Sequence, residues 1–276
     1  MADKEKEKRC AEAVEKSKEV IRQAFKDYKI EDAAITWTGG KDSTLVLWII
    51  RQVCQEDNIK LPKVMTIDEY DSFEEIHDFL NKYAKEWNLN LEWCRNDDVI
   101  KAAGGKLNNI VKVSDLNKRN QAELERIGFK EDSFPFEAES YTGNHLMKTV
   151  MFNMYIERHK VKAIFQGLRR DEQTARAEDD YFEKKEAAHL IPEHMRIKPI
   201  LHFTERLLWD TYQVYKIPYC PLYEQGYRSL GAKTTSAIAE PGVPAWEQDL
   251  EHTTERAGRR QDKEQMMSRL RDLGYM

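Results

Sequence analysis

A glycine pair between two regular elements constrains this chain more than any other feature. Residues 36–44 read Thr-Trp-Thr-Gly-Gly-Lys-Asp-Ser-Thr, and Gly39 and Gly40 follow an apolar stretch at 33–37. A helix-like stretch begins near Leu45. A strand, a glycine turn and a helix N-terminus in this order form an anion cradle, because glycines let the backbone approach oxyanions and the first helical N–H groups point at them.

The side chains of this glycine loop favour a polyphosphate ligand. Thr38 and Ser43 add hydroxyl donors, and Lys41 adds a positive charge. The loop differs from the P-loop of kinases and GTPases, which requires another glycine five residues before the Gly-Lys pair. An ordinary strand-to-helix turn, capped by Asp42 or Ser43, is the alternative interpretation.

Hydrophobic periodicity predicts strands and helices in alternation. Such alternation favours right-handed βαβ units, and hence an α/β fold with an open, mostly parallel sheet flanked by helices. The segment 96–143 is less regular and is expected to be a lid or an insertion. The predicted strands are 33–37, 63–68, 89–94, 162–166 and 195–199, and the predicted helices are 5–29, 41–55, 73–87, 145–158, 204–215 and 262–272.

We divide the chain at residue 216. Residues 1–216 are expected to form a nucleotide-binding α/β domain with an N-terminal helix. Residues 217–276 are rich in proline and glycine at first, and are expected to form a less regular C-terminal extension that packs on the site or on a partner.

Composition limits the function classes. The net charge is −5, so no global basic field favours nucleic acid. No signal peptide or 20-residue apolar span is present, and the four cysteines form no Cys-x-x-Cys pair. We therefore expect a reduced cytoplasmic protein without a membrane segment or a metal–thiolate site.

A second group of polar residues follows the predicted strand at 162–166. Gly167 begins a loop that contains Arg169, Arg170 and Asp171. In open α/β sheets ligands bind beyond the carboxyl ends of the strands, so this loop should share a crevice with the glycine loop. Guanidinium groups suit forked recognition of sulfate or phosphate, although such a run taken alone is often a solvated turn.

These motifs carry a resemblance to known families. The glycine loop resembles the Ser-Gly-Gly-x-Asp-Ser loop of the ATP pyrophosphatases, with Thr38 in the place of the first serine. Residues 167–177 resemble the signature of the PAPS reductase family, and within it most closely the small catalytic subunit of bacterial ATP sulfurylase. Thr66-Ile67-Asp68 with Phe73-Glu74-Glu75 is similar to the family's second nucleotide strand and the helix after it, and His145-Leu146-Met147-Lys148-Thr149 matches a His-x-x-x-Lys pattern at a helix start. The tail Glu255-Arg256-x-Gly258-Arg259-x-x-Asp262 resembles that of the same subunit. The segment 223–231 departs from it and is closer to the reductases.

The resemblance implies an adenine nucleotide alpha hydrolase-like fold and an ATP-dependent adenylyltransferase, in which sulfate attacks the α-phosphate of ATP. Arg169 and Arg170 would hold sulfate and the α-phosphate, with His145 and Lys148 as secondary candidates, unless His145 makes only a backbone contact. The nucleotide and its pyrophosphate would be bound by Thr38, Gly39, Gly40, Lys41, Asp42, Ser43 and Gly167.

Further expectations concern the ribose, the metal and the partners. Asp68 would contact ribose or adenine, or only cap the next element. Mg²⁺ would bridge the phosphates, with Asp42 or Asp171 holding one of its waters. The resembled subunit is driven by a GTPase, so a GTPase partner is implied. The sequence leaves a homo-oligomer open, and Arg256, Arg259 and Arg260 would contact phosphate, a partner or only solvent.

Two other hypotheses stay open. A thionucleotide reductase would need a thiolate nucleophile, but no cysteine follows Cys220, and Arg256 stands where the reductase tail carries its thiol. Cys220 is then either a substitute or a packed thiol. A third hypothesis is adenylylation of another acceptor, such as FMN or a tRNA base.

Overall fold

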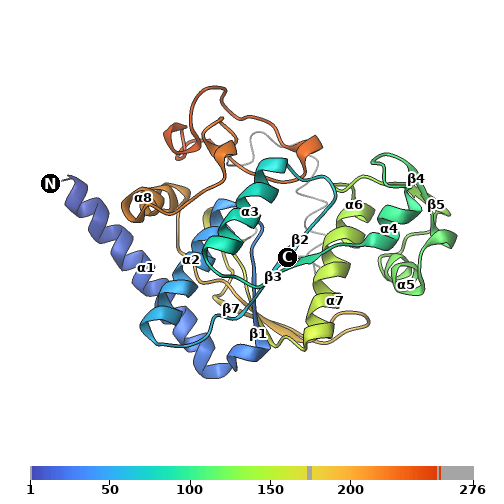
Figure 1. Ribbon diagram of the computed structural model, residues 1–276, viewed down its shortest axis with the longest axis horizontal. Coiled ribbons are helices and arrows are strands. Elements are labelled where there is room, and N and C mark those ends of the chain that lie inside the picture. Colours follow the sequence, from blue (N-terminus) through green and yellow to red (C-terminus); the bar gives the residue numbers. More distant parts are fainter. Residues whose placement is uncertain (1, 173–175, 254, 256–276) are drawn as a thin grey trace.

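The computed structural model describes residues 2–172, 176–253 and 255. Its centre is a six-stranded sheet with strand order β3–β2–β1–β6–β8–β7 (Figure 1). All neighbours are parallel except β7 and β8, so the predicted open, mostly parallel sheet is confirmed. The strands are β1 (Ala33–Thr36), β2 (Lys63–Ile67), β3 (Leu91–Cys94), β6 (Ala163–Phe165), β7 (Phe182–Lys185) and β8 (His194–Ile197).

The helices around this sheet also agree with the predicted pattern, apart from their ends. Thr204 caps α8, because its side chain accepts a hydrogen bond from the backbone N–H of Leu207. A π-helical turn, His145–Thr149, precedes α7. The helix predicted at 262–272 lies outside the described residues. The helices are α1 (Ala2–Asp27), α2 (Lys41–Glu56), α3 (Glu74–Glu86), α7 (Val150–His159) and α8 (Glu205–Tyr215).

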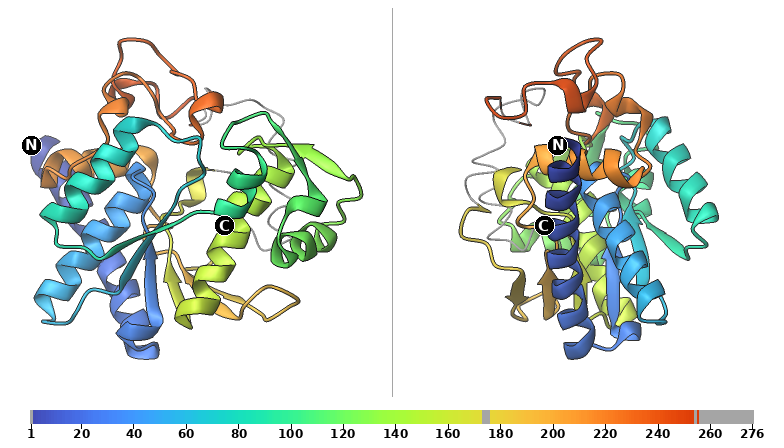
Figure 2. Two further views of the ribbon diagram at one scale, coloured as in Figure 1. Left: turned by 45° about the vertical axis from the view of Figure 1, so that its right-hand side comes forward. Right: turned by 90° about the vertical axis from the view of Figure 1, so that its left-hand side faces the viewer.

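The alternation of side chains along the strands explains the three layers. Ala33 and Ile35 of β1 face a core shared with α1, α2, α3 and α8, whereas Ala34 faces a core shared with α7. Phe165 and Ile164 of β6 divide between the same two cores. Successive strand residues point to opposite faces, so apolar runs of this kind need helices on both sides (Figure 2).

Strand β7 is a strand that periodicity did not predict. Its sequence is Phe-Glu-Lys-Lys, it lies at the edge of the sheet, and it pairs with β8 in antiparallel register. Edge strands commonly carry charged residues, which discourage pairing with other chains. Such a strand buries little apolar surface, and the sequence pattern therefore lacks the apolar alternation on which prediction depends.

The sheet topology places two loops at one point. From β1 the chain continues through β2 to β3 on one side, and β6 later pairs with β1 on the other side. The loops that follow β1 and β6 therefore diverge at their carboxyl ends, where open α/β sheets leave a crevice. These are the glycine loop and the loop that begins at Gly167.

Residues 97–144, which we call the side lobe, pack separately beside α7 (Figures 1 and 2). Their core includes Val99, Val111, Leu124 and Phe136. The same cluster includes Met147 and Val150, so the lobe is an insertion that packs on the start of α7 through a core separate from those of the sheet. It contains α4 (Asp97–Ala102), β4 (Ile110–Lys112), α5 (Lys118–Arg126), β5 (Ser133–Pro135) and α6 (Tyr141–Asn144), with β4 and β5 antiparallel.

The C-terminal extension packs back on the main core through Ile217, Tyr223 and Ala245. The division of the chain at residue 216 stays a prediction. The regular structure of its described part is three 3₁₀ helices, Pro221–Tyr223, Lys233–Thr235 and Ala245–Glu247.

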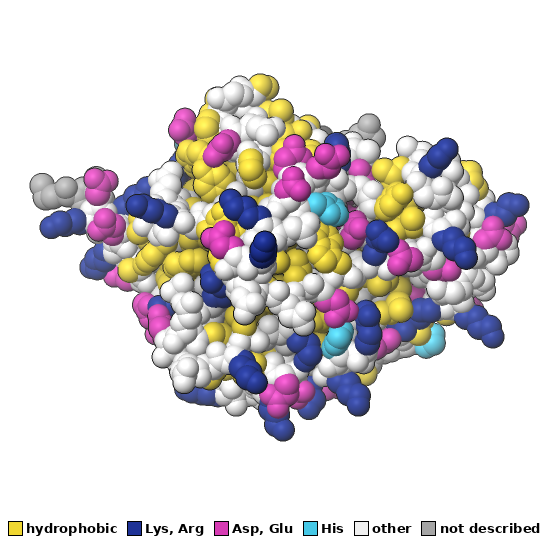
Figure 3. Space-filling view, viewed as in Figure 1, with side chains coloured by type: hydrophobic (Ala, Val, Ile, Leu, Met, Phe, Trp, Pro, Cys, Tyr) yellow, Lys and Arg dark blue, Asp and Glu magenta, His cyan; other side chains and the backbone are white. Residues whose placement is uncertain are grey.

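The surface carries charges of both signs. On the face shown in Figure 3, basic and acidic side chains are interspersed. Within the described ranges, no helix combines the length and the apolar character needed to cross a membrane.

The side lobe provides a test of its separate core. Phe136 is fully buried in that core. We expect Phe136→Ala to lower the free energy of unfolding by about 3–5 kcal/mol, because it removes a large ring and leaves a cavity. Ile110→Ala is the matched control, since Ile110 lies in the same lobe at 61% exposure and should change stability by less than about 0.5 kcal/mol. Equal effects in denaturant titrations would contradict the proposed core.

Candidate functional site

The glycine loop is held in shape by its own side chains. Gly39 has a φ of +76°, and a side chain there would meet Ile76 at 3.0 Å. The backbone N–H of Thr38 donates to the hydroxyl of Ser43 at 3.1 Å, and that hydroxyl donates to the carbonyl of Gly40 at 3.1 Å. Gly40 is the residue that precedes the first turn of α2. The loop therefore brings the start of α2 to the carboxyl end of β1, as an anion cradle requires.

Lys41 is buried below this loop and is anchored from the C-terminal half of the chain. Its side chain is only 2% exposed. Its backbone N–H donates to the Tyr223 hydroxyl at 2.8 Å, and its carbonyl accepts from the Tyr212 hydroxyl at 2.5 Å. Its Nζ donates to the carbonyl of Arg228 at 3.1 Å. Tyr212 lies outside the motifs discussed above, whereas Tyr223 begins the segment 223–231 that is similar to the reductases.

The loop after β6 packs directly on the start of α2. A Cβ atom at Gly167 would lie 2.5 Å from the backbone nitrogen of Ser43 and 2.5 Å from the carbonyl carbon of Asp42. Real Cβ atoms do not approach backbone so closely, so the two loops can pack only because residue 167 is glycine. The structure thus brings Gly167 together with the glycine loop, as the topology predicts.

Arg169 links the two loops by charge. Its side chain is fully buried, and its Nε donates to Oδ1 of Asp42 at 2.5 Å. Its Nη1 lies 2.9 Å from Oδ1 of Asp171, and its Nη2 is paired with Glu255. All these partners are carboxylates, which together meet the cost of burying a guanidinium.

Arg170 points elsewhere. Its Nη2 donates to the carbonyl of Asp179 at 2.8 Å, and its guanidinium carbon lies 5.5 Å from the centre of the Tyr181 ring. Of the two adjacent arginines proposed to hold the oxyanion, the structure therefore brings only Arg169 to the glycine loop. Arg176 is also buried, and it pairs with Glu172.

The charged residues around Lys41 and Arg169 form a buried ion cluster. Glu205 lies 3.9 Å from Nζ of Lys41, and Arg228 binds the Glu205 carboxylate through Nη2 at 2.8 Å. Glu205, Arg228 and Glu255 are site residues that sequence reasoning missed, although Arg228 and Glu255 lie in segments that carried the family resemblance. The members of this buried ion cluster are Lys41, Arg169, Arg228, Asp42, Asp171, Glu205 and Glu255.

The cluster shifts the pKa values of its members. Burial alone would lower the pKa of the Lys41 ammonium, but the carboxylates of Glu255, Asp42 and Glu205 raise it. Burial would raise the pKa of Glu255, but the charges of Lys41 and Arg169 hold it at about 2. Burial raises the pKa of Glu205, against the effect of Lys41 and Arg228. Lys41 and Glu255 are therefore both charged at neutral pH.

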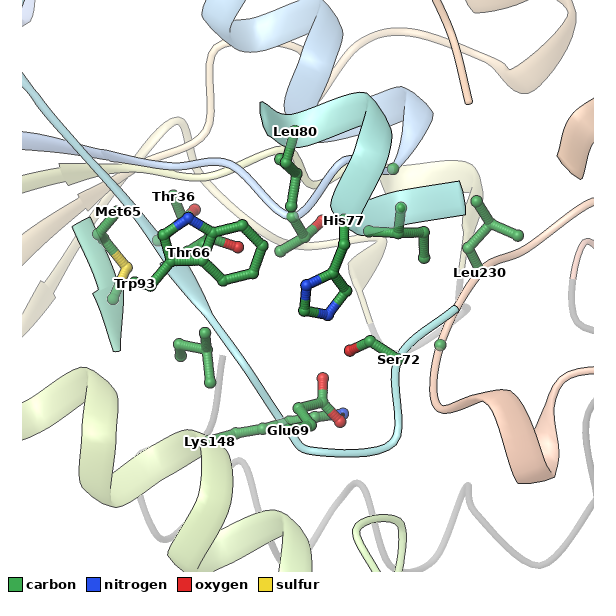
Figure 4. A pocket seen from close by; sticks show the side chains of 15 residues that line it. Thr36, Met65, Thr66, Glu69, Ser72, His77, Leu80, Trp93, Lys148 and Leu230 are labelled. Carbon is green, nitrogen blue, oxygen red and sulfur yellow. Dashed lines mark ion pairs between the residues drawn. The ribbon is translucent and has the colours of Figure 1, made fainter. Parts of the chain in front are cut away.

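A pocket adjoins the glycine loop between β1, β2 and α3 (Figure 4). The rings of His77 and Trp93 stack there, with their centres 4.8 Å apart. Lys148 and Glu69 lie on the other side and form an ion pair of 2.6 Å. The pocket combines an apolar lining with a few polar groups, as small-molecule sites do. Its lining also includes Thr36, Thr38, Gly40, Met65, Thr66, Ile67, Ser72, Ile76, Leu80, Leu230 and Gly231.

Three predicted site residues remain, and they lie in three different places: Asp68 in a turn, Lys148 in this pocket and His145 against the side lobe. Asp68 accepts a hydrogen bond from the backbone N–H of Tyr70 at 2.9 Å, which is a turn contact, and it is Glu69 that lines the pocket. Lys148 lies in the pocket. His145 is fully buried, and its Nε2 lies 3.1 Å from Oε2 of Glu123 in α5. His145 therefore contacts the side lobe, and we assign it no part in the reaction.

All four cysteines are buried as free thiols, including Cys220. Burial raises the pKa values of Cys54, Cys94 and Cys220 to about 11, and it also raises that of Cys10. A nucleophilic thiol needs the opposite environment, namely exposure and a lowered pKa. The packed-thiol interpretation of Cys220 therefore agrees with its surroundings.

The oxygen ligands available to a metal are carboxylates of the buried ion cluster. Among the described residues, no group of three His, Cys, Asp or Glu side chains is placed to hold a metal ion. Asp42 and Asp171 have the right donor type for Mg²⁺, but both already bind Arg169. The residues fit a magnesium ion that is carried mainly by phosphates and water, as Mg²⁺ often is.

Comparison with known structures identifies the class of fold. The structure is similar to the FMN adenylyltransferase of Candida glabrata, with a TM-score of 0.67 and 18% identity over 92% of this chain and 88% of that chain. It is also similar to the phosphoadenylyl-sulfate reductase of Candida auris, with a TM-score of 0.55 and 17% identity over 80% and 90% of the two chains. The chain thus shares the fold of these two enzymes, and its open, mostly parallel sheet flanked by helices is as predicted.

The chain belongs to the phosphoadenosine phosphosulfate reductase domain family, which it matches over residues 32–237. It is 34% identical over 100 residues to a phosphoadenosine 5′-phosphosulfate reductase of Xanthomonas oryzae, and 32% identical over 100 residues to one of Xylella fastidiosa. Each match covers 36% of this chain and only 39% or 40% of the relative. The family of the chain is therefore established, whereas matches over so small a part of the relatives do not define its reaction.

The contact at Gly167 can be tested directly. We expect Gly167→Ala to displace the start of α2 and to weaken binding of pyrophosphate at least tenfold, or about 1.4 kcal/mol. Gly242→Ala is the control, because Gly242 also has a positive φ but a Cβ there meets no atom within 4 Å. Isothermal titration calorimetry with pyrophosphate measures both affinities. Equal affinity for the two variants would show that the close packing at Gly167 does not shape the site.

The thiols give a second test. With pKa values of about 11, only about one thiol in 10,000 of Cys54, Cys94 and Cys220 is ionised at pH 7. We expect the native protein to react with a thiol-specific reagent far more slowly than the same protein in denaturant, where four thiols should be counted. One rapidly reacting cysteine in the native protein would contradict this prediction and reopen the reductase hypothesis.

Proposed function

We propose that this protein is an ATP-dependent adenylyltransferase, and that sulfate is its acceptor. The observation that carries the proposal is the pair of buried cations, Lys41 and Arg169, on the loops that follow β1 and β6. Their donors converge on a single carboxylate, that of Glu255. A carboxylate in this position stands in for an oxyanion, and both sulfate and phosphate offer oxygen atoms of the same kind.

In the proposed reaction a sulfate oxygen attacks the α-phosphorus of ATP. A new bond forms between that oxygen and phosphorus, the bond between the α-phosphorus and the bridging oxygen breaks, and pyrophosphate leaves with the electron pair. The reaction needs no covalent residue, so positioning and charge stabilisation supply the catalysis. Lys41 and Arg169 would neutralise the charge that develops on the leaving and attacking oxygens.

The glycine loop would bind the β,γ-pyrophosphate with its backbone N–H groups and with the hydroxyls of Thr38 and Ser43. The adjoining pocket would take the nucleoside, since it begins at Thr38 and Gly40 and is apolar further in. Mg²⁺ would bridge the phosphates, and Asp42 is the carboxylate best placed on the loop to hold one of its waters.

A partner completes the proposal. Formation of adenylyl sulfate from ATP is uphill, and the described residues contain no second nucleotide loop that could couple another hydrolysis to it. The resemblance of the tail and of the 167–177 loop to the small subunit of ATP sulfurylase therefore leads us to propose a GTPase partner.

A reductase is the competing proposal, because the sequence relatives are named reductases. That reaction requires a thiolate to attack sulfur. The buried cysteines, with their raised pKa values, argue against it. The described tail residue that reaches the cations is Glu255, which has no thiol.

FMN is the competing acceptor. The observation in its favour is the similarity to FMN adenylyltransferase over 92% of this chain and 88% of that chain. The pocket lined by His77 and Trp93 would still take the nucleoside of ATP, so FMN would need a second stacking surface.

The deciding assay is pyrophosphate release from ATP and Mg²⁺. It should be run with sulfate, with FMN and with neither, in the presence and absence of a cognate GTPase with GTP, beside thioredoxin-coupled reduction of adenylyl sulfate and of its 3′-phosphorylated form. We expect release that depends on sulfate. Release that depends on FMN would replace the acceptor, and formation of sulfite would overturn the proposal.

Substitution of the cations tests the same mechanism. We expect Arg169→Lys to lower sulfate-dependent turnover at least 100-fold, because lysine keeps the charge but loses the forked donors. Lys41→Ala should have a loss of similar size. Arg158→Ala is the control, since the Arg158 side chain is 56% exposed and pairs with Glu92 on the surface. If Arg169→Lys retained full turnover, Arg169 would not contact the reacting groups.

A further inference from the structure

The carboxylate of Glu255 occupies the position that we assign to an oxyanion. Its two oxygens are shared between the two cations, with Oε1 on Nζ of Lys41 and Oε2 on Nη2 of Arg169. The side chain of Glu255 is only 7% exposed, and those of Lys41 and Arg169 are 2% and 0% exposed. The donors that would hold phosphate or sulfate are therefore engaged by the protein itself.

The charge balance of the buried ion cluster shows why a ligand and Glu255 exclude each other. As described, three cations, Lys41, Arg169 and Arg228, face four carboxylates. A polyanion added to this set would increase an existing surplus of negative charge in a site of low dielectric. Withdrawal of Glu255 would leave three carboxylates against three cations, and it would free one donor on Lys41 and one on Arg169.

The chain just before Glu255 is held in place by Arg228. The Nη1 of Arg228 donates to the carbonyl of Asp249 at 3.2 Å, and its Nη2 donates to the carbonyl of Thr253 at 3.1 Å. Arg228 is itself fixed by the carboxylate of Glu205. Residues 249–253, which we call the strap, are thus tied to the buried ion cluster, so that a change at Glu255 alone can open or close the oxyanion position.

We propose that Glu255 is a built-in competing anion, which closes the empty site and is displaced when phosphate or sulfate oxygens bind to Lys41 and Arg169. The inference rests on the proposed function only in that this position binds an oxyanion, and it does not depend on the acceptor. The strap remains bound to Arg228 while the Glu255 side chain leaves. In the empty site Glu255 pairs with both Lys41 and Arg169, so a ligand must compete with it for their donors.

Competition between Glu255 and the oxyanion lowers the apparent affinity of the site for the oxyanion. If the open form is a minority, the measured dissociation constant exceeds the intrinsic one by the inverse of the open fraction. The charges of Lys41 and Arg169 keep the pKa of Glu255 at about 2, so the competing carboxylate stays ionised across the ordinary range of assay pH. The effect should therefore be present at neutral pH.

Glu255→Gln is the principal test, because it removes the charge and keeps the shape. We expect calorimetry with pyrophosphate to give a dissociation constant at least tenfold lower for Glu255→Gln than for the unaltered protein. Glu251→Gln is the matched control: the Glu251 side chain is 53% exposed, lies in the strap and pairs with Arg206, and its replacement should change the affinity less than twofold. Unchanged or weakened binding by Glu255→Gln would overturn the inference.

Hydrogen exchange of the unaltered protein gives a second test that does not depend on a variant. Addition of pyrophosphate should speed exchange of the backbone N–H of Glu255, because its side chain loses its anchors, and should leave exchange in residues 249–253 unchanged, because Arg228 still holds them. Slower exchange there would mean that the tail closes on the ligand, and would overturn the inference. Both tests measure binding, so failure of sulfate-dependent turnover would refute the proposed function while leaving this inference standing.

Discussion

A fully buried guanidinium keeps its place only while carboxylates surround it, because its desolvation costs several kcal/mol. In this chain that group is Arg169, which binds Asp42 from the glycine loop, Asp171 from its own loop and Glu255 from the tail. The positive charge of Arg169 thus holds together three segments that are distant in sequence. The start of α8 is tied to the same group, since Asp171 also accepts a hydrogen bond from the backbone N–H of Glu205.

The close approach at Gly167 makes this arrangement possible. With the two loops in backbone contact, Arg169 reaches the glycine loop without crossing solvent, and the charges act on one another at low dielectric. The same burial makes unpaired cations costly. In the structure the tail supplies a partner for Nζ of Lys41 and for Nη2 of Arg169 through Glu255.

A reductase and an adenylyltransferase would differ in the side chain that the tail places beside Lys41 and Arg169. A thiol delivered to the oxyanion position attacks sulfur, whereas a carboxylate there can only bind or leave the cations. In this chain the described tail residue beside the cations is Glu255, and all four cysteines are buried. Under the proposed function, this carboxylate would stand where a reductase needs a thiol.

The sequence by itself determined the fold class and the two loops, because those signals are local. Short apolar runs defined β1 and β6, and Gly39, Gly40 and Gly167 marked the positions where backbone must turn or approach closely. Strand β7 escaped prediction, since an edge strand needs no apolar pattern. Only the tertiary structure decided which charges meet. Adjacent arginines point to different partners, His145 turns into the side lobe, and Glu255 reaches Lys41 across 214 residues of chain. Such pairings depend on where the folded backbone places each side chain, and no local pattern encodes them.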